Sequence, residues 1–439
     1  MPSTHISLST LFDQHAQPSG NTLSVNAAKQ IIQQYIRALS DKESVGIFTA
    51  LGRVLADDIV STLNVPPHDN SAMDGYALAG EQLAQGDRLE LTVVGDSFAG
   101  RPFQGAVNVG ECVRIMTGAV MPFGCDTVVP QELTTAINNS TDIQMSGHKI
   151  SFSTTKLKLG DNRRFAGEDL AANQTAVSRG QKLGAAHLGL IASLGIDQVN
   201  VYRPLRVAYF STGDEVRSVG ESLSAGSIYD SNRYTVFAML KRLGIDMIDL
   251  GVVPDNPEAM EATLRQACLS ADAIITSGGV SVGAADYTKD VMAKLGEVGF
   301  WTIGMRPGRP MAFGRISHDD KSAYLFGLPG NPVAVMVSFL YFVRDALLHM
   351  QGAKVPALLL VPARSSHSIR KRQGRTEYQR GIARTNSDGQ LEVSVTGSQG
   401  SGVLRSMAEA NCMIVLHDEQ TDIRSGDMVH IHLFDGLLA

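Results

Sequence analysis

Segments with the spacing of strands and of helices alternate between residues 205 and 350, and this alternation limits the possible folds more than any other feature of the chain. The apolar runs RVAYF, DMIDLGVV, AIIT, GFWTI and AYLFG are typical of buried strands. Between and after them, Ser231–Leu243, Pro257–Leu269, Tyr287–Leu295 and the long apolar segment Pro332–His349 predict helices. Strands that alternate with helices predict a doubly wound α/β domain with a parallel sheet, whose ligands bind at the carboxyl ends of the strands.

The segment AIITSGGVSVGAADYTK, residues 273–289, gives the clearest sign of a ligand. Its strand breaks into a glycine loop that starts at Gly278 and Gly279, and a helix follows from about Asp286. Glycines allow close approach and positive φ, so the loop and the helix N-terminus present backbone N–H groups to an anion. A carboxylate such as Asp286 is useful beside an anion only if a cation is shared with it. Taken alone, a tight turn with a capping Asp explains the same residues equally well.

Three further loops follow predicted strand ends in the same domain. Glu215 lies in the STGDE loop after RVAYF, Asp255 follows DLGVV, and Asn331 precedes Pro332 with the pattern of a helix start. Each loop alone is explained as an ordinary turn. Together with the glycine loop and Asp286, they predict a site that binds a phosphorylated ligand with Mg²⁺.

Two arginines, Arg306 and Arg309, follow the GFWTI strand in the segment MRPGRP. Pro307 and Pro310 restrict this loop, and guanidinium groups bind the oxygens of an anion in pairs, so the segment suits a tetrahedral oxyanion. An exposed basic turn is the alternative when the neighbouring loops are ignored. A second basic cluster, RKRQGR at residues 370–375, is expected to be a solvated loop.

Outside residues 205–350, the pattern of residue types changes at several points. An amphipathic helix is expected at Ser24–Leu39 and a short one at Leu51–Ala56. Short β-prone segments broken by Gly, Pro and Asn come next, and the residues after Gly352 are again β-prone throughout. The expected domains are a helical or mixed connecting domain (21–61 and 174–204), an inserted small β domain (62–173), the α/β domain (205–350) and a C-terminal β-barrel (351–439).

Composition places the chain among globular proteins and excludes several functional classes. Of 439 residues, 44% are hydrophobic and 19% are charged, and the net charge of −6 argues against a nucleic-acid binder. The four cysteines lie far apart, which predicts free thiols in a reducing compartment and no structural zinc site. The N-terminus does not look like a signal peptide, and no stretch reaches the roughly 18 apolar residues of a membrane span. We therefore expect a cytoplasmic protein that binds neither nucleic acid nor membrane.

Seven segments, taken together and in order, resemble the motifs of one family: PPHDNSAMDGYA, RIMTGAVMPFGCDTVV, NRRFAGED, STGDE, SGGVSVGAADYTK, MRPGRPMAFG and GLPGNPV. The family is that of the molybdopterin molybdenumtransferases, which includes bacterial MoeA and the C-terminal domain of gephyrin. The resemblance runs from about Ser24 to the C-terminus. Seven ordered motifs are far more specific than one glycine loop.

The resemblance implies a molybdenum insertase of molybdenum cofactor biosynthesis. Such an enzyme inserts molybdate into adenylylated molybdopterin and releases AMP with the help of Mg²⁺ or a similar divalent ion. The resemblance also implies an elongated homodimer, in which one chain's α/β domain and its partner's inserted β domain share each site. Transient contact with other molybdenum cofactor synthesis proteins is a further expectation.

Residue roles are carried over motif by motif. The implied catalytic residues are Asp74, Thr117 and Asp169 in the inserted β domain, and Glu215 and Asp286 in the α/β domain. The implied metal ligands are Glu215, Asp255 and Asp286. The MRPGRP segment is expected to capture molybdate. The residues implied to bind the molybdopterin substrate or molybdate are Thr212, Gly213, Ser277, Gly278, Gly279, Ser281, Gly283, Arg306, Pro307, Arg309, Pro310, Gly330 and Asn331.

The chain departs from the common pattern of the family at a few positions. Thr302 stands where many members have Lys, Ala284 stands where Glu is usual, and arginines replace lysines at 306 and 309. The arginines keep the charge, whereas the loss of a lysine at 302 argues against a direct role for that position. Two other functions share part of the pattern. A molybdopterin adenylyltransferase needs neither the inserted β domain nor the barrel, and a non-catalytic scaffold needs no intact carboxylates.

Overall fold

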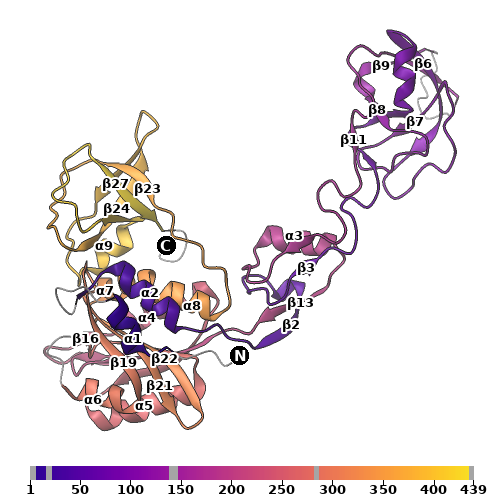
Figure 1. Cartoon of the computed structure of the whole chain (residues 1–439). Coiled ribbons are helices and arrows are strands. Elements are labelled where there is room, and N and C mark those ends of the chain that lie inside the picture. Colours follow the sequence, from indigo (N-terminus) through magenta and orange to yellow (C-terminus); the bar gives the residue numbers. More distant parts are fainter. Residues whose placement is uncertain (1–5, 16–21, 138–146, 281–285, 435–439) are drawn as a thin grey trace.

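The computed structural model describes residues 6–15, 22–137, 147–280 and 286–434. The chain is elongated: the α/β domain and the C-terminal barrel lie together at one end, and the inserted β domain lies at the other (Figure 1). The connecting domain lies between these two ends. This arrangement matters for function, because predicted site residues come from both ends.

A twisted sheet forms the centre of the α/β domain. In spatial order, its strands are β1 (Thr22–Leu23), β19 (Gly296–Ile303), β21 (Pro310–His318), β22 (Lys321–Leu328), β18 (Ala273–Ser277), β14 (Arg206–Thr212) and β17 (Asp246–Val253). The neighbours β22, β18, β14 and β17 run parallel, as the alternation predicts. The sheet is mixed rather than wholly parallel, because β21 forms an antiparallel hairpin with β22 and also pairs antiparallel with β19.

Helices cover both faces of this sheet. They are α4 (Ser231–Leu243), α5 (Pro257–Ser270), α6 (Asp286–Leu295), and α7 (Pro332–Ser338) with η4 (Phe339–Val343) and α8 (Arg344–Met350). Successive residues of β14 point to opposite faces, so Tyr209 lies in the core with α4 and α7, whereas Phe210 lies in the core with α5. Both side chains are fully buried. The strands are therefore buried on both sides, which explains their continuous apolar runs.

The helical run Pro332–Met350 is long and apolar enough to span a membrane by length and composition, with a mean hydropathy of 1.5. The expectation that no stretch of the chain would qualify was therefore wrong. However, 89% of the apolar window is buried inside the protein, so this run is the core helix of the α/β domain.

The N-terminal elements α1 (Leu8–His15), β1 and α2 (Val25–Tyr35) pack on the α/β domain. Ser24 caps α2, because its hydroxyl accepts a hydrogen bond from the backbone N–H of Ala27 at 3.1 Å. Ile31 and Tyr35 lie in the same core as the run 332–350. The connecting domain as a packed unit therefore begins after α2, later than the predicted boundary at residue 21.

The connecting domain consists of paired strands and one helix. Its elements are β2 (Lys42–Gly46) paired with β13 (Gln198–Tyr202), β3 (Ile59–Val60) paired with β12 (Thr175–Val177), the turn η1 (Ile47–Thr49) and α3 (Ala185–Ser193). The helix predicted at Leu51–Ala56 is absent from this described part of the chain. Val54 and Leu55 are instead extended, since they pair with Lys182 and Val201 across the domain.

The inserted β domain is built on a sheet with the order β8 (Thr127–Pro130), β5 (Gly75–Leu78), β7 (Glu111–Ile115), β6 (Arg88–Ser97), β10 (Lys149–Ser153) and β9 (Thr134–Ala136). The turns η2 (Gly80–Gln85) and η3 (Gln131–Leu133) connect these strands, and β4 (Asn70–Ser71) pairs with β11 (Arg163–Arg164) beside them. The two chain segments that enter and leave the domain bond to each other at Val65 and Leu170.

The C-terminal barrel closes because β24 pairs with both β25 and β26. Its elements are β23 (Val361–Ser365), β24 (Thr376–Thr385), β25 (Leu391–Val395), α9 (Leu404–Glu409), β26 (Cys412–Leu416) and β27 (Met428–Leu433). The predicted fold class, an α/β domain with an inserted β domain and a barrel, is confirmed. The expectation of a solvated loop at 370–375 was wrong for Lys371. This lysine is 5% exposed, and its ammonium donates to the carbonyls of Arg372 and Arg375 at 2.7 Å.

Candidate functional site

A cavity of about 370 Å³ lies where the parallel strands β14, β18 and β22 end side by side. Their ends are in register, with Ser211 opposite Ser277 and Ser277 opposite Leu328. We call it the strand-end cavity. Of the predicted site residues, it is lined by Thr212, Gly213, Glu215, Asp255, Ser277, Gly278, Gly279, Gly330 and Asn331.

Backbone conformation explains the glycines of this cavity. Gly278 has φ +94°, and a Cβ there would lie 2.5 Å from the carbonyl oxygen of Thr212. Gly279 also has a positive φ of +68°. A side chain at Gly278 would be both strained and blocked by the neighbouring strand, so the loop exposes bare backbone instead. Such a loop admits a ligand close to its backbone, although the N–H of Gly278 itself donates to the carbonyl oxygen of Leu328 at 3.1 Å.

A buried network of hydroxyl groups lies beneath the cavity. The hydroxyl of Tyr209 lies 2.8 Å from Ser211 Oγ and 2.7 Å from Ser277 Oγ. Ser211 in turn donates to Asp230 Oδ2 at 2.7 Å. The other oxygen of Asp230 accepts from the backbone N–H of Arg233 and caps α4. Burial raises the pKa of Tyr209 well above its usual value, so its proton stays in the network.

Sequence reasoning missed Asp230 and Asn232, although both line the cavity. Asp230 precedes the predicted helix 231–243 in the YDSNR segment, and this capping position was the signal that could have identified it. Asn232 donates from Nδ2 to the carbonyl oxygen of Gly330 at 2.7 Å and so joins two loops of the wall.

Two buried oxygen atoms in the cavity wall have no hydrogen-bond partner among the described residues. They are Thr212 Oγ1 and Asn232 Oδ1. A buried polar atom without a partner is costly, so such atoms in a cavity wall point to a polar ligand that completes them. The wall therefore favours a ligand with several hydrogen-bonding groups as well as phosphates.

The predicted metal ligands are only partly brought together in the described residues. Glu215 and Asp255 both line the strand-end cavity, and Asp286 is the first residue of α6. The side chain of Asp286 lies outside the described residues, as do Ser281, Gly283 and Ala284. Within the described residues, no three His, Cys, Asp or Glu side chains form a metal-binding group. Two carboxylates together with ligand phosphates still suit Mg²⁺, which commonly binds in that way.

The predicted oxyanion segment lies beside the barrel rather than in the wall of the strand-end cavity. Arg306 belongs to β20 (Met305–Arg306), which pairs with β24 of the barrel so that Arg306 lies opposite Glu377. Arg306 and Arg309 are exposed, and Pro307 between them is buried. Thr302 is half-buried on β19 and lies opposite Pro310.

A buried arginine of the barrel, Arg380, lies near Arg306 and was missed by sequence reasoning. It is 1% exposed, and its guanidinium donates to the hydroxyl of Ser406 at 3.1 Å and to the carbonyls of Ser398 and Gly400. Burial, followed by the charge of Arg306, lowers the pKa of Arg380 to about 10. Two neighbouring cations favour a bound anion.

The barrel also contributes to the surroundings of the strand-end cavity. The backbone N–H of Val333, at the start of α7, donates to the carbonyl oxygen of Ser401 at 3.0 Å. The barrel loop that holds Arg380 is therefore attached to the helix that follows Asn331. This contact brings the basic residues of the barrel side near the cavity.

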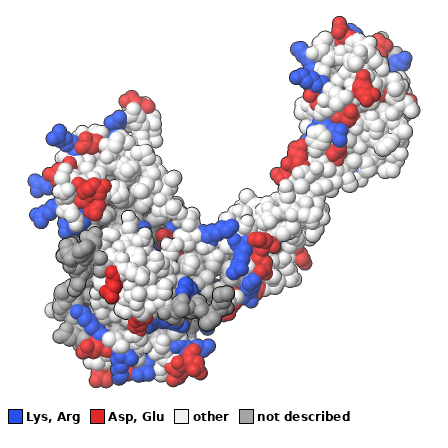
Figure 2. Space-filling view, in the orientation of Figure 1, with Lys and Arg blue, Asp and Glu red and all other residues white. Residues whose placement is uncertain are grey.

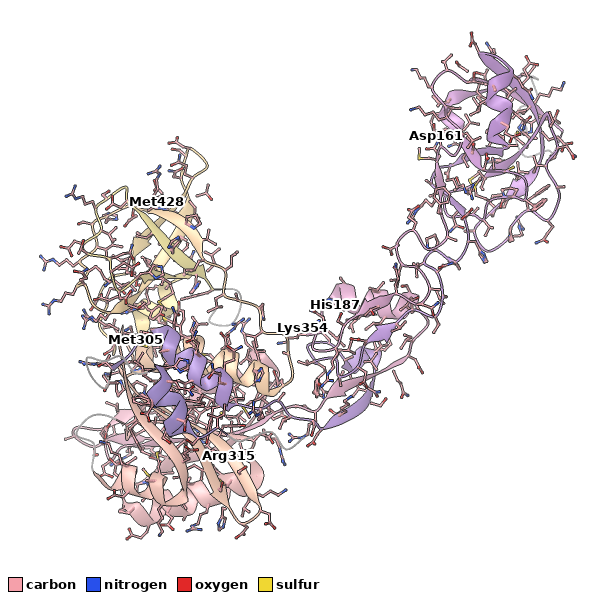
Figure 3. The ribbon with its side chains drawn as sticks, in the orientation of Figure 1. Asp161, His187, Met305, Arg315, Lys354 and Met428 are labelled. Atoms are coloured by element: carbon pink, nitrogen blue, oxygen red, sulfur yellow. The ribbon has the colours of Figure 1, made fainter. Side chains whose placement is uncertain are left out.

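The three site residues predicted in the inserted β domain lie at the end of the molecule opposite the strand-end cavity (Figure 1). Thr117 donates to Asp74 Oδ1 from its backbone N–H and from its hydroxyl, both at 2.7 Å. These two bonds lower the pKa of Asp74. Asp169 is exposed near the entry to the domain. Figure 3 labels Asp161 in this domain and Met305 beside the barrel, at opposite ends of the molecule. One chain thus carries two groups of predicted site residues that do not meet.

Three family models match the chain in succession. Residues 23–195 match the model described as MoeA N-terminal region (domain I and II), and residues 208–349 match a probable molybdopterin binding domain. Residues 362–434 match the model described as MoeA C-terminal region (domain IV). The strand-end cavity lies within the second model, and Asp74, Thr117 and Asp169 lie within the first.

Known proteins are similar over nearly the whole chain. A molybdopterin molybdenumtransferase of Haemophilus influenzae is 40% identical over 95% of this chain and 100% of its own length. Another, of Nostoc, is 38% identical over 88% of this chain and 87% of its own length. Gephyrin of Dictyostelium discoideum is 32% identical over 92% of this chain and 61% of its own length. The crystal structure of the molybdopterin biosynthesis moeA protein from Pyrococcus horikoshii has a TM-score of 0.78 at 27% identity, and covers 94% of this chain and 100% of that one.

Proposed function

The chain belongs to the molybdopterin molybdenumtransferase family, and from that premise we propose that it inserts molybdate into adenylylated molybdopterin and releases AMP. The observation that carries this proposal is the strand-end cavity. It combines a glycine loop, two carboxylates and unpartnered polar atoms at the carboxyl ends of parallel strands. Its position within the matched molybdopterin binding domain supports the choice of substrate.

Different residues of the strand-end cavity bind different parts of the substrate. The backbone N–H of Gly279 and the positive end of the helix that begins at Pro332 hold phosphate oxygens, since N–H dipoles attract anions. The N–H groups of Gly278 and Val333 do not take part, because they already donate to Leu328 and Ser401. Thr212 and Asn232 present buried polar atoms to the uncharged part of the substrate. Binding at several points fixes the phosphoanhydride with respect to the cavity wall, which favours reaction.

Glu215, Asp255 and Asp286 would hold a divalent cation such as Mg²⁺, as the carboxylates on the cavity wall and at the start of α6 suggest. When bound, the cation neutralises charge that develops on the leaving AMP phosphate.

Molybdate is the second substrate, and the MRPGRP segment is our proposal for its capture. Arg306 and Arg309 are exposed to solvent and can receive an oxyanion. Arg380 supports them from the barrel, because its buried charge lies near Arg306 without a carboxylate partner. Thr302 is not needed for charge in this arrangement.

We also propose that the active form is a homodimer in the cytoplasm. Asp74, Thr117 and Asp169 lie at the opposite end of the chain from the strand-end cavity (Figure 1). A second chain could supply them if the two chains lie side by side in opposite directions, since a twofold pair exchanges equivalent surfaces. Each dimer would then hold two sites, each made from both chains.

Two alternatives differ in what they leave unexplained. A molybdopterin adenylyltransferase would account for the α/β domain but for neither the inserted β domain nor the barrel. A non-catalytic scaffold would account for all of the domains. The scaffold has no need of Glu215, Asp255 and Asp286, all of which the chain retains.

The deciding experiment is to incubate the purified chain with adenylylated molybdopterin, molybdate and Mg²⁺, and to follow AMP. We expect AMP release that depends on molybdate, and a strong loss of release in Arg306→Gln. Release of pyrophosphate from ATP in the presence of free molybdopterin would instead support the adenylyltransferase. Binding of molybdopterin without any AMP release would support the scaffold.

A further inference from the structure

A second and larger cavity, of about 600 Å³, lies where the connecting domain meets the α/β domain and the segment that leads to the barrel. We call it the junction cavity. Its walls come from the connecting domain, the end of α4, α8, and the segment that leads from α8 to the barrel. Figure 3 labels Lys354 on that segment, beside the connecting domain. The cavity is lined by Gln181, Lys182, Arg242, Leu243, Arg344, Leu348, Ala353, Lys354, Val355 and Pro356, and shares none of these with the strand-end cavity.

The charged residues that line the junction cavity are all basic. They are Lys182, Arg242, Arg344 and Lys354, and none of the described lining residues is Asp or Glu. Arg344 pairs with Asp345 at 2.5 Å, whereas the side chains of Arg242 and Lys354 have no ion pair among the described residues. In Figure 2, basic side chains gather where the connecting domain joins the α/β domain, with acidic ones beside them on the connecting domain. The cavity itself therefore has excess positive charge.

Burial makes the charges of Arg344 and Lys182 costly, whereas Arg242 and Lys354 are exposed at the rim of the cavity. Arg344 is 7% exposed. Burial lowers the pKa of Lys182, and the charge of Arg344 lowers it further. The ammonium of Lys182 has a weak contact, 3.4 Å, with the carbonyl oxygen of Leu243 at the end of α4. Cations are favoured at a helix C-terminus, which accounts for Lys182 and Arg242. It does not account for Arg344 and Lys354, which come from other segments and face the same space.

Backbone hydrogen bonds connect the segments that line the junction cavity. The N–H of Lys354 donates to the carbonyl oxygen of Gly180 at 2.8 Å, which joins the segment before the barrel to the connecting domain. Lys182 pairs with Val54 across the connecting domain. The four cations are thus carried by segments that are fixed to one another, so their convergence is a property of the fold.

We propose that the junction cavity binds a small organic phosphate, a phosphate monoester with an apolar body. The four cations match a doubly charged phosphate, because guanidinium and ammonium groups are its usual partners. Leu243, Leu348 and Val355 match the apolar body, and the volume is that of a small-molecule site. This inference does not rest on the proposed reaction, since the two cavities have separate walls.

The test uses the reactivity of individual lysines in the intact chain. An amine-reactive reagent is added with and without a phosphate probe, and labelling of each lysine is measured by mass spectrometry. The probes are AMP and inorganic phosphate, which carry similar charge, whereas only AMP has an adenine ring that can pack on the apolar wall. Lys241 is the matched control, because it is adjacent to Arg242 on α4 and does not line the cavity.

We expect AMP to protect Lys182 and Lys354 at lower concentration than inorganic phosphate does, and to leave Lys241 unprotected. Arg242→Gln should raise the AMP concentration for half-protection about tenfold, and Lys241→Gln should not change it. Equal protection of all three lysines, or no protection at millimolar AMP, would overturn the proposal. So would inorganic phosphate acting as well as AMP, because the apolar wall would then have no role.

AMP bound at the strand-end cavity would not protect Lys182 or Lys354 from labelling, because neither lysine lines that cavity. If an acidic peptide protects Lys182 and Lys354 whereas AMP does not, the cavity is a protein contact and the proposal is wrong. A normal melting temperature of Arg242→Gln shows that any change in protection is not a folding defect.

Discussion

Thr117 donates two hydrogen bonds to the same carboxylate oxygen of Asp74, one from its backbone N–H and one from its hydroxyl, each at 2.7 Å. The backbone bond, and after it the hydroxyl bond, lowers the pKa of Asp74. The carboxylate is thereby kept ionised and held in one orientation on the surface of the inserted β domain. The two residues are hydrogen-bonded to each other, although the sequence analysis placed them in separate motifs.

We expect Thr117→Val to reduce AMP release by about tenfold and Thr117→Ser to retain it, because only the valine loses the hydroxyl bond. Activity that needs the carboxylate is lost as pH falls through the pKa of Asp74. Since Thr117→Val removes a bond that lowers this pKa, the acidic limb of kcat/KM should move to higher pH. An acidic limb that is the same in both variants would separate Thr117 from the ionisation of Asp74.

Asp286→Asn should lower AMP release by roughly a hundredfold or more and leave the fold nearly unchanged. Asn is nearly the same size and can occupy the first position of the helix that begins at residue 286, but it removes a negative charge that the divalent cation needs. Asp290→Asn, on an exposed position of the same helix, is the matched control and should keep normal turnover. Turnover and melting temperature are measured together. Near-normal release by a folded Asp286→Asn chain would argue against a metal-binding role for Asp286.

Two inactive variants should restore activity to each other if each site is made from two chains. Asp74→Asn damages only the inserted β domain, and Asp255→Asn damages only the strand-end cavity. Random exchange of equal amounts gives mixed dimers with one intact site each, so about a quarter of normal activity should return. The measurement is AMP release before and after subunit exchange. Mixtures that stay inactive, although mass measurements find mixed dimers, would argue for a site within one chain.

The ion pair between Arg203 and Asp272 should stabilise the start of the α/β domain. Arg203 donates to both carboxylate oxygens at 2.7 and 2.8 Å, and the backbone N–H of Arg206 adds a bond at 2.9 Å. Burial alone would raise the pKa of Asp272, but these bonds outweigh it and lower that pKa. We expect Asp272→Asn to lower the free energy of unfolding by about 2 kcal/mol at neutral pH.

The pH dependence of this effect follows from the direction of the shift. A depressed folded-state pKa stabilises the protein above the unfolded-state value, and the stabilisation is lost as pH falls through the folded-state value. The difference between wild type and Asp272→Asn should therefore shrink below about pH 4. Urea unfolding at several pH values checks this, with the exposed Asp246→Asn as control. A difference that is constant with pH would point to packing rather than to charge.

Local signals explain the parts of the fold that the sequence predicted well. The predicted helix Ser231–Leu243 has the observed bounds, because Asp230 caps its start and Gly244, in a left-handed conformation, ends it. The predicted strand DMIDLGVV likewise corresponds to β17. In both cases neighbouring residues determine where the element begins and ends.

The parts that sequence reasoning missed depend on distant partners. The strand β21 follows a proline-rich loop and becomes a strand only by pairing between β19 and β22. Lys371 looked solvated because its neighbours are basic, but its ammonium is enclosed by carbonyls of its own turn. Arg380 lies within an ordinary strand pattern, and its burial is caused by a loop some twenty residues further along the chain. No local pattern carries that information.

Among the residues of the candidate site, those with a local signal were likewise predicted, and those that depend on distant partners were missed. The glycine loop, Glu215 and Asp255 were predicted from turn chemistry, and they meet in one cavity. Asp230 was missed because a helix cap is found at many sites without a ligand, and only the folded chain places this one in the cavity wall. The separation between Asp74 and this cavity was implied only by the resemblance, since no residue pattern specifies how far apart two domains lie.

The length of the molecule also has a consequence for the cell. A single chain holds the inserted β domain away from its own strand-end cavity (Figure 1). If the reaction needs both, an isolated chain is inert, and turnover per chain falls on dilution below the dissociation constant of the pair. The abundance of the protein then acts as a threshold: halving its synthesis near that threshold would reduce cofactor output by more than half.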